Sequence, residues 1–212
     1  MRDFPVFATE NGVGSLILKE IPYWQCAYIR IQSASDPEAF LQECLDFCNM
    51  AGAQKVYATG HECLQSYPEH TDIWKMQIPA QSLMHTEDAL FPITEQTAET
   101  WQSIYNEKMR NVPNAAYMTR KDMAELCEKG GGYFVHDQGQ LLGIGMVSDH
   151  CLDAVISVQK GAGERVVSAL SQCIGDETVT LQVASANAKA IALYERLGFV
   201  KVSELSKWYC VK

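Results

Sequence analysis

The sequence predicts an α/β (α+β) fold in which helices flank a mixed β-sheet. Apolar residues recur with helical period in several segments, short β-branched runs separate them, and glycine, proline or capping residues stand between them. In the second half these signals give the order β-α-α-β-β-β-α-β-α-β-β. The first half gives a hairpin followed by β-α-β-turn-β. Because this matches the later part of the second half, we expect a partial repeat of the same fold before it.

Composition narrows the class of protein. The chain has 212 residues, of which 47% are hydrophobic and 20% charged, and this balance excludes a disordered tail, a collagen-like fibre and a disulfide mini-protein. Its apolar runs are shorter than the ~18 residues that span a bilayer, so no membrane helix or membrane partner is expected. The N-terminal segment Met1–Pro5 carries an acid and a proline where a secretory signal has an apolar core, which favours a cytoplasmic protein. The net charge of −9 argues against nucleic acid and slightly favours a cationic small substrate.

The first half, residues 1–80, contains one strong helix signal between short strand signals. Ser35–Glu38 opens the helix with a cap, a proline and acids, and Gly52 is a plausible C-terminal cap. Strands are predicted at 11–18, 25–32, 55–59 and 73–78, with a helical turn at 61–65.

The second half, residues 81–212, opens with a polar linker at 80–88. Thr119 with Asp122 resembles a capping box, and Gly130, Gly175 and Gly198 are expected to end helices. Helices are predicted from Thr94 to about Met109, from Thr119 to Gly130, at 163–174 and from Asn187 to Gly198. Strands are predicted at 90–93, 133–136, 141–147, 152–158, 178–184, 200–205 and 208–211.

The eight cysteines include no CxxC pair. Cys44, Cys48, His61 and Cys63 could be drawn together as a metal site. Because no tight ligand pair accompanies them, free core thiols are favoured and no metal is expected.

Two segments carry residues suited to chemistry. Gly161-Ala-Gly163 lies between a predicted strand and helix, where backbone N–H groups at a helix N-terminus can bind a diphosphate. The segment is neither a P-loop nor a full dinucleotide fingerprint, and a plain glycine-containing turn is the alternative. A second pair, Gly143 and Gly145, lies within a predicted strand and indicates a bulge or a close backbone approach.

The second segment runs from Asn187 to Phe199. Asn187 is expected to cap a helix. Tyr194 lies beside the apolar face of that helix, where it either packs or donates a proton to a leaving group.

Together these segments resemble the GCN5-related N-acetyltransferase (GNAT) family. The family's C-terminal pattern, roughly N-x-x-A-x-x-x-Y-E-x-x-G-F, is matched here by Asn187, Ala190, Tyr194, Glu195, Gly198 and Phe199. The order of elements from 90 to 211 also follows that fold. The resemblance implies a mixed, mostly antiparallel GNAT-like sheet flanked by helices. It implies an acetyltransferase domain at 81–212 and a degenerate half-GNAT-like region at 1–80.

The sequence departs from the family's diphosphate loop in one side chain and in a turn that is shorter than usual. Where the family has arginine or glutamine, three residues before the first loop glycine, this chain has Val158. Backbone N–H groups can still bind a diphosphate, and Lys160 can add charge. The equivalent turn of the first half, 32–38, has no glycine and carries two acids, so this region is expected to have lost cofactor binding.

The resemblance implies an acetyl-CoA-dependent N-acetyltransferase that transfers the acetyl group directly to a primary amine of a small molecule or peptide. An amide near Ile156 or Val158 would hold the thioester carbonyl. Tyr194 would protonate the CoA thiolate, and the general base could be Asp153, His150, His136 or water. The cofactor-binding residues implied are Ile156, Val158, Lys160, Gly161, Ala162, Gly163, Glu164, Asn187 and Tyr194.

Other functions stay open at this stage. The same scaffold could use another acyl-CoA, or the chain could be a degenerate CoA-binding or regulatory module without activity. The retained Tyr194 argues against degeneration. A nicotinamide oxidoreductase is disfavoured by the glycine spacing. Both a monomer and a homodimer are compatible with the sequence.

Overall fold

The computed structural model describes residues 5–175 and 177–212. The chain forms two compact units: unit 1 comprises Met1–Ile73 and Glu204–Lys212, and unit 2 comprises Trp74–Ser203. The prediction that the chain has no secretory signal depends on residues 1–5, and residues 1–4 lie outside the described residues. No described helix is long and apolar enough to cross a membrane.

Unit 1 is a small sheet with one long helix. Its strands are β1 (Val6–Ala8), β2 (Gly12–Ile17), β3 (Cys26–Ala34), β4 (Lys55–Thr59) and the ends of β5 (Glu69–Pro79) and β11 (Val200–Cys210). Its helices are α1 (Ile21–Trp24), α2 (Pro37–Met50) and the 3₁₀ helix η1 (Glu62–Ser66). Strands β1, β2 and β3 pair antiparallel, whereas β3 and β4 pair parallel across the α2 connection. Alternate strand residues such as Ile29 and Val56 are fully buried in one core with Phe40 of α2.

Unit 2 contains the larger part of the sheet, in the order β11-β5-β10-β9-β8-β7-β6. Its other strands are β6 (Ala89–Pro92), β7 (Gly132–Asp137), β8 (Gln140–Ser148), β9 (Cys151–Ser157) and β10 (Thr178–Ala184). Its helices are α3 (Ala98–Met109), α4 (Arg120–Lys129), α5 (Gly163–Ser171), α6 (Ala188–Leu197) and the 3₁₀ helices η2 (Ala80–Ser82) and η3 (Gln172–Ile174). Neighbouring strands from β6 to β9 are antiparallel, and β9 and β10 are parallel. The predicted mixed, mostly antiparallel sheet flanked by helices is confirmed.

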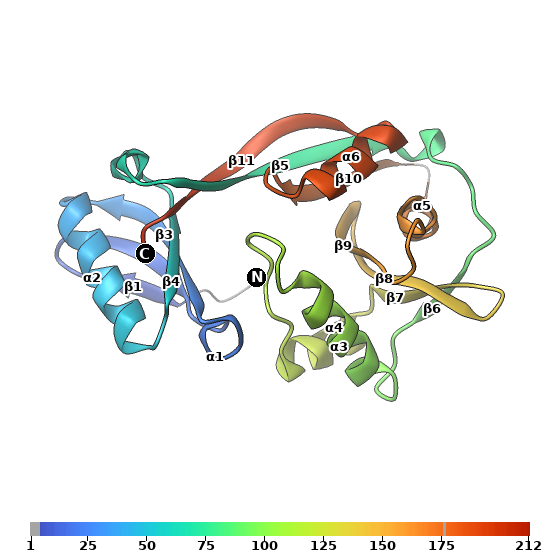
Figure 1. The fold of residues 1–212 in the computed structure, drawn as a ribbon, viewed down its shortest axis with the longest axis horizontal. Coiled ribbons are helices and arrows are strands. Elements are labelled where there is room, and N and C mark those ends of the chain that lie inside the picture. Colours follow the sequence, from blue (N-terminus) through green and yellow to red (C-terminus); the bar gives the residue numbers. More distant parts are fainter. Residues whose placement is uncertain (1–4, 176) are drawn as a thin grey trace. The chain divides into compact units, whose positions relative to one another are not determined.

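Two separate cores cover the two faces of this sheet. Val167 of α5 and Tyr194 of α6 share a core with Leu181 of β10. Trp101 of α3 and Met123 of α4 share another core with strands β7 to β9. The two helix pairs are drawn in green and in orange to red (Figure 1). Apolar side chains on the two faces of the strands therefore pack into the two different cores.

The local signals place most elements correctly. Residues 55–59 and 178–184 form strands with the predicted bounds, and Thr119 and Asp122 form the predicted capping box. The prediction of two strands at the C-terminus is wrong, because β11 runs unbroken from Val200 to Cys210. Its centre contains no glycine or proline, and the Lys207 carbonyl accepts a hydrogen bond from Thr59 Oγ1 at 2.6 Å, which keeps the backbone extended.

The bounds of the two compact units differ from 1–80 and 81–212. Strands β5 and β11 contribute residues to both units, and the end of β11 pairs with β4 through Tyr209 and Cys210. The division into domains at 1–80 and 81–212 stays a prediction. The interpretation of the first region as a degenerate half-repeat stays a prediction.

Cys44 and Cys48 lie in the core of unit 1, and Cys63 packs against it. Cys44 and Cys48 are fully buried on α2, and burial raises the pKa of the Cys44 thiol to about 12 and that of Cys48 to about 11. Within the described part of the chain, no group of three or more histidine, cysteine or acidic side chains is arranged to hold a metal ion.

Candidate active site

Strands β9 and β10 separate shortly after they begin. Their parallel pairing comprises Thr180 with Cys151 and Leu181 with Leu152, and no further pair joins them in the described residues. Beyond Leu152, strand β9 continues to pair with β8 alone. The two parallel strands therefore open a gap between their backbones. Along this gap the backbone N–H and C=O groups of β9 form no ladder with β10 in the described residues.

A β-bulge in the β8–β9 pairing affects which backbone amides of β9 point toward the gap. The β8–β9 register shifts between Met146 and Val147, so one extra residue, Asp153, enters β9. After the bulge the Val158 N–H donates to the Leu142 carbonyl at 2.8 Å.

In an antiparallel ladder the bonded residues alternate, so Ile156, opposite Ile144, also directs its amide to β8. The amides that point toward the gap are then those of Val155 and Ser157. The prediction placed the carbonyl-binding amide near Ile156 or Val158. In the structure the amides of Ile156 and Val158 point to β8 instead, so the neighbouring amides of Val155 and Ser157 are the candidates for that role.

The glycine pair of β8 has the structural role that the sequence indicated. A Cβ on Gly143 would lie 2.3 Å from the Ile156 carbonyl oxygen. On Gly145 it would lie 2.2 Å from Leu170 Cδ1 of α5. The prediction of a close backbone approach at these residues is confirmed.

The predicted diphosphate turn connects β9 to α5. Gly161 has φ +85°, and a Cβ built there would meet no atom within 4 Å, so the turn faces open space. The N-cap residue is Ala162, whose side chain cannot accept a hydrogen bond. The first-turn N–H groups of α5 at Gly163, Glu164 and Arg165 therefore have no side-chain cap at this position, which suits an anionic ligand.

Gly163 also sets the spacing between two helices. A Cβ at this position would lie 2.9 Å from Cδ2 of Leu193 on α6. The glycine thus brings the start of α5 close to the helix that carries Tyr194.

Charged residues around the turn are mostly engaged with one another. Glu164 pairs with Arg196 of α6 at 3.0 Å. Arg165 forms an ion pair with Asp88 and another, at 2.9 Å, with Asp137. Lys160 is exposed and carries no ion pair within the described residues. It is therefore the cation of the turn that is available to a ligand.

Tyr194 lies on the inner face of α6. Asn187 caps this helix by accepting the Ala190 N–H at 3.3 Å, as predicted, and Gly198 ends it in the left-handed region. The ring of Tyr194 packs 5.6 Å from that of Phe199, and burial raises the pKa of Tyr194 to about 12. Its hydroxyl has no hydrogen-bond partner among the described residues. The side chain is buried as a whole, and its protonated hydroxyl can donate a proton at neutral pH.

The three candidate bases occupy different surroundings. His150 Nε2 lies 3.1 Å from Glu177 Oε2. Asp153 accepts a short hydrogen bond from Ser148 Oγ. His136 lies on β7, edge-on to Phe91, and β7 is separated from β9 by strand β8.

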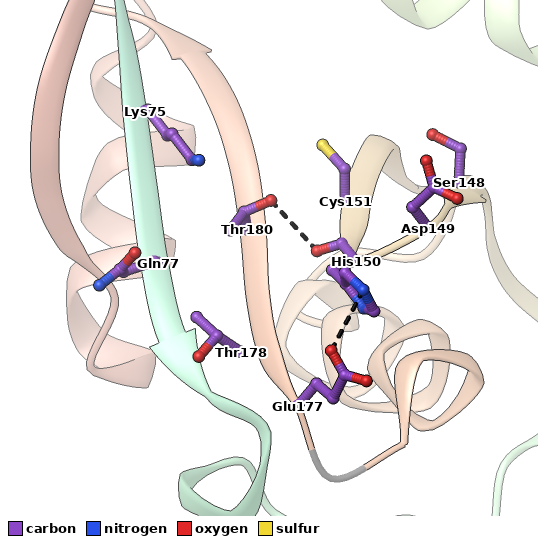
Figure 2. Close-up of a pocket in the computed structure, with 9 residues that line it drawn as sticks. All are labelled: Lys75, Gln77, Ser148, Asp149, His150, Cys151, Glu177, Thr178 and Thr180. Carbon is purple, nitrogen blue, oxygen red and sulfur yellow. Dashed lines mark hydrogen bonds and ion pairs between the residues drawn. The ribbon is translucent and has the colours of Figure 1, made fainter.

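A cavity of about 490 Å³ opens beside the start of β9 and β10. Figure 2 shows that its side chains come from β5, from β10 and from the turn between β8 and β9. The residues that line it are Lys75, Gln77, Ser148, Asp149, His150, Cys151, Glu177, Thr178 and Thr180. Among the candidate bases, His150 is the one that lines this cavity.

Sequence reasoning missed most of these lining residues. The run Lys75-Met-Gln77-Ile78 alternates polar and apolar residues, and so does Thr178–Leu181. Such alternation says that one face is polar. It does not say that two strands far apart in the chain pair and present those polar residues to one cavity.

Part of the sequence matches a protein-family model, and the whole fold is similar to solved structures. Residues 154–209 match the family model described as FR47-like protein. None of the curated proteins matches the sequence. A conserved protein of unknown function from Staphylococcus epidermidis is 10% identical, with a TM-score of 0.63 over 99% of this chain and 94% of that chain.

Two further solved structures carry the family name. The GCN5-related N-acetyltransferase from Anabaena variabilis has a TM-score of 0.63 at 13% identity, over 94% of this chain and 59% of that chain. One from Kribbella flavida has a TM-score of 0.56 at 13% identity, over 100% of this chain and 91% of that chain. The chain has the fold of the GCN5-related N-acetyltransferases. The segment 154–209, which includes Asn187–Phe199, is similar to the FR47-like family model.

Proposed function

We propose that this protein is an acetyl-CoA-dependent N-acetyltransferase that transfers the acetyl group directly to a primary amine. The observation that carries the proposal is the divergence of β9 and β10 between an uncapped helix N-terminus and the buried Tyr194. Each of the three serves a different part of an acetyl thioester.

The turn at Gly161–Gly163 would hold the cofactor diphosphate. The positive φ of Gly161 and the open space around it let the backbone approach a ligand closely. The N–H groups at the start of α5 supply donors, and Lys160 supplies charge. These contacts compensate for Val158, which stands where the family has arginine or glutamine.

The gap between the strands would hold the thioester. An amide of Val155 or Ser157 that points into the gap would donate to the thioester carbonyl oxygen. The same amide would then stabilise the negative charge that develops on this oxygen when the amine attacks. Because strand backbone is rigid, this donor needs no rearrangement during the reaction.

Tyr194 would complete the transfer. As the C–S bond breaks, sulfur leaves as a thiolate, and the Tyr194 hydroxyl would donate its proton to it. With a pKa of about 12, the hydroxyl is protonated throughout the neutral range. If Tyr194 only packed in the core, a phenylalanine would serve equally well, because the Tyr194 hydroxyl forms no hydrogen bond within the described residues.

Calorimetric titration with acetyl-CoA tests the donor site. Gly161→Val is expected to weaken binding at least tenfold, because its side chain would occupy the space over the turn. Gly130→Val is the matched control, since Gly130 has φ +79° and equally open surroundings at the end of α4. Equal affinities of both variants for acetyl-CoA would refute the assigned turn, and wild-type protein that binds no acetyl-CoA at millimolar concentration would refute the function.

A further inference from the structure

The cavity of Figure 2 adjoins the place where β9 and β10 diverge. Cys151 and Thr180 line the cavity and form the first pair of the parallel ladder. The next pair, Leu152 with Leu181, is the last before the strands separate. The cavity is thus one residue, ~3.3 Å along the strand, from the start of the gap.

The cavity lies on the face of the sheet opposite α5 and α6. Met76 of β5 and Leu181 of β10 are buried in the core beneath those helices. Because side chains alternate across a strand, Lys75 and Thr180 point to the other face. A molecule in the cavity would therefore approach the gap from the side that the diphosphate turn does not occupy.

Opposite charges line opposing walls of this cavity. Lys75 is half-buried on β5, and Figure 2 shows its ammonium group pointing toward Thr180 and into the cavity. Asp149 and the His150–Glu177 pair form the opposite wall. Within residues 5–175 and 177–212, neither Lys75 nor Asp149 forms an ion pair. A half-buried ammonium without a carboxylate partner is stabilised by an anionic group of a ligand.

We propose, resting on the proposed function, that this cavity binds the acetyl acceptor and that the acceptor is a small zwitterion with a primary amine and a carboxylate, such as an amino acid. Lys75 pairs with the carboxylate. The ammonium group of the acceptor lies toward Asp149 and His150. The cavity volume of about 490 Å³ falls in the ~300–1,000 Å³ range of small-molecule sites.

His150 has the geometry to activate this amine. Nε2 lies 3.1 Å from Glu177 Oε2, so in the neutral form that acts as a base Glu177 accepts the Nε2–H and the Nδ1 lone pair accepts the proton. His150 takes a proton from the ammonium group, and the amine nitrogen forms a bond to the thioester carbon. The C–S bond breaks, Tyr194 gives its proton to sulfur, and the nitrogen loses its second proton to solvent. His150 then releases its proton to solvent and Tyr194 takes one up, so one proton is released overall. The products are an N-acetyl amino acid and CoA.

The test measures CoA thiol release with the twenty standard L-amino acids at millimolar concentration. Every amino acid accepted is then compared with its amide and with its decarboxylated amine, which keep the amino group and lose the carboxylate. We expect kcat/KM for the amino acid to exceed that for both analogues at least tenfold. Equal or better use of the analogues would overturn the proposal, as would rejection of all amino acids by protein that binds acetyl-CoA.

Lys75→Met supplies a second, independent comparison. This variant keeps the length of the side chain and removes its charge, so it is expected to raise KM for the amino acid and to abolish the preference over the amide. Lys121→Met, at an exposed lysine of α4, is the matched control and is expected to keep the preference. A preference that persists in Lys75→Met would overturn the assignment of the carboxylate site. If the protein binds no acetyl-CoA, the proposed function fails. Titration of the same amino acids into the protein without acetyl-CoA then still tests the cavity, because Lys75→Met must weaken any binding.

Discussion

The Nε2 atom of His150 lies 3.1 Å from Oε2 of Glu177, although the two residues stand on different loops of unit 2. His150 precedes β9 and Glu177 precedes β10, so the parallel pairing of these strands brings the two side chains together. A carboxylate that accepts one imidazole N–H fixes which ring nitrogen can accept a proton. This pair is therefore suited to orient a general base at the edge of the candidate acceptor cavity.

His150→Gln is expected to lower kcat by ~10²-fold with little change in the Kd for acetyl-CoA. Glu177→Gln is expected to cause a smaller loss, because it disturbs orientation and keeps the imidazole. Steady-state kinetics and calorimetry check both variants, with His85→Gln, an exposed linker histidine, as control. A kcat of His150→Gln equal to that of the wild type would remove His150 from the reaction.

Tyr194→Phe is expected to lower kcat while the Kd for acetyl-CoA and the melting temperature stay close to those of the wild type. The substitution keeps the ring that packs 5.6 Å from Phe199, and within the described chain the hydroxyl has no hydrogen bond to lose. Tyr209→Phe is the matched control, since Tyr209 is also a buried tyrosine, 8% exposed, and lies in unit 1. An unchanged kcat would reduce Tyr194 to a packing residue.

Gly143→Ala is expected to destabilise the protein by ~1–3 kcal/mol, because its Cβ would lie 2.3 Å from a backbone oxygen that cannot rotate away. Gly130→Ala meets no atom within 4 Å, so only the cost of its backbone conformation, φ +79° with ψ −172°, is expected, ~1–3 kcal/mol. Urea denaturation measures both. An unchanged denaturation midpoint for Gly143→Ala would contradict the close strand approach.

Alkaline pH is expected to destabilise unit 1 through its buried thiols. Burial raises the pKa of Cys44 to about 12 and of Cys48 to about 11, from 9.0 for a free thiol. The unfolded chain therefore loses these protons first, so stability is complete below pH ~9 and falls as the pH rises toward 11–12. Melting temperatures from pH 8 to 10.5 check this. Cys44→Ala should lower the melting temperature at pH 8 and flatten its fall with pH, and an equally steep fall would contradict the assignment.

Local sequence signals were sufficient for most of the fold. The Thr119–Asp122 capping box, the Asn187 cap and the positive-φ Gly161 and Gly198 each act within a few residues, so their effects can be read from neighbouring letters. The continuous strand β11 could not be read in this way. Its extended centre depends on pairing with strands far away in the sequence, including the bond to Thr59.

The candidate site divides along the same line. Tyr194 and the glycine turn belong to motifs, so the sequence located them. The orientation of the Val155 and Ser157 amides depends on the register of β9 after a single-residue bulge at Asp153. Lys75 and His150 line one cavity only because β5, β10 and β9 are neighbours in the sheet. Neither relation leaves a local pattern in the chain.

The central claim is transfer of an acetyl group from acetyl-CoA to an amine, and mass spectrometry of the reaction mixture tests it most directly. Purified protein is incubated with acetyl-CoA and the amino acid panel, with protein-free and Tyr194→Phe samples alongside. The account predicts an N-acetylated product in amounts equal to the CoA released, with strongly reduced formation in Tyr194→Phe. Protein that binds acetyl-CoA yet acetylates neither these acceptors nor their amides and amines would contradict it.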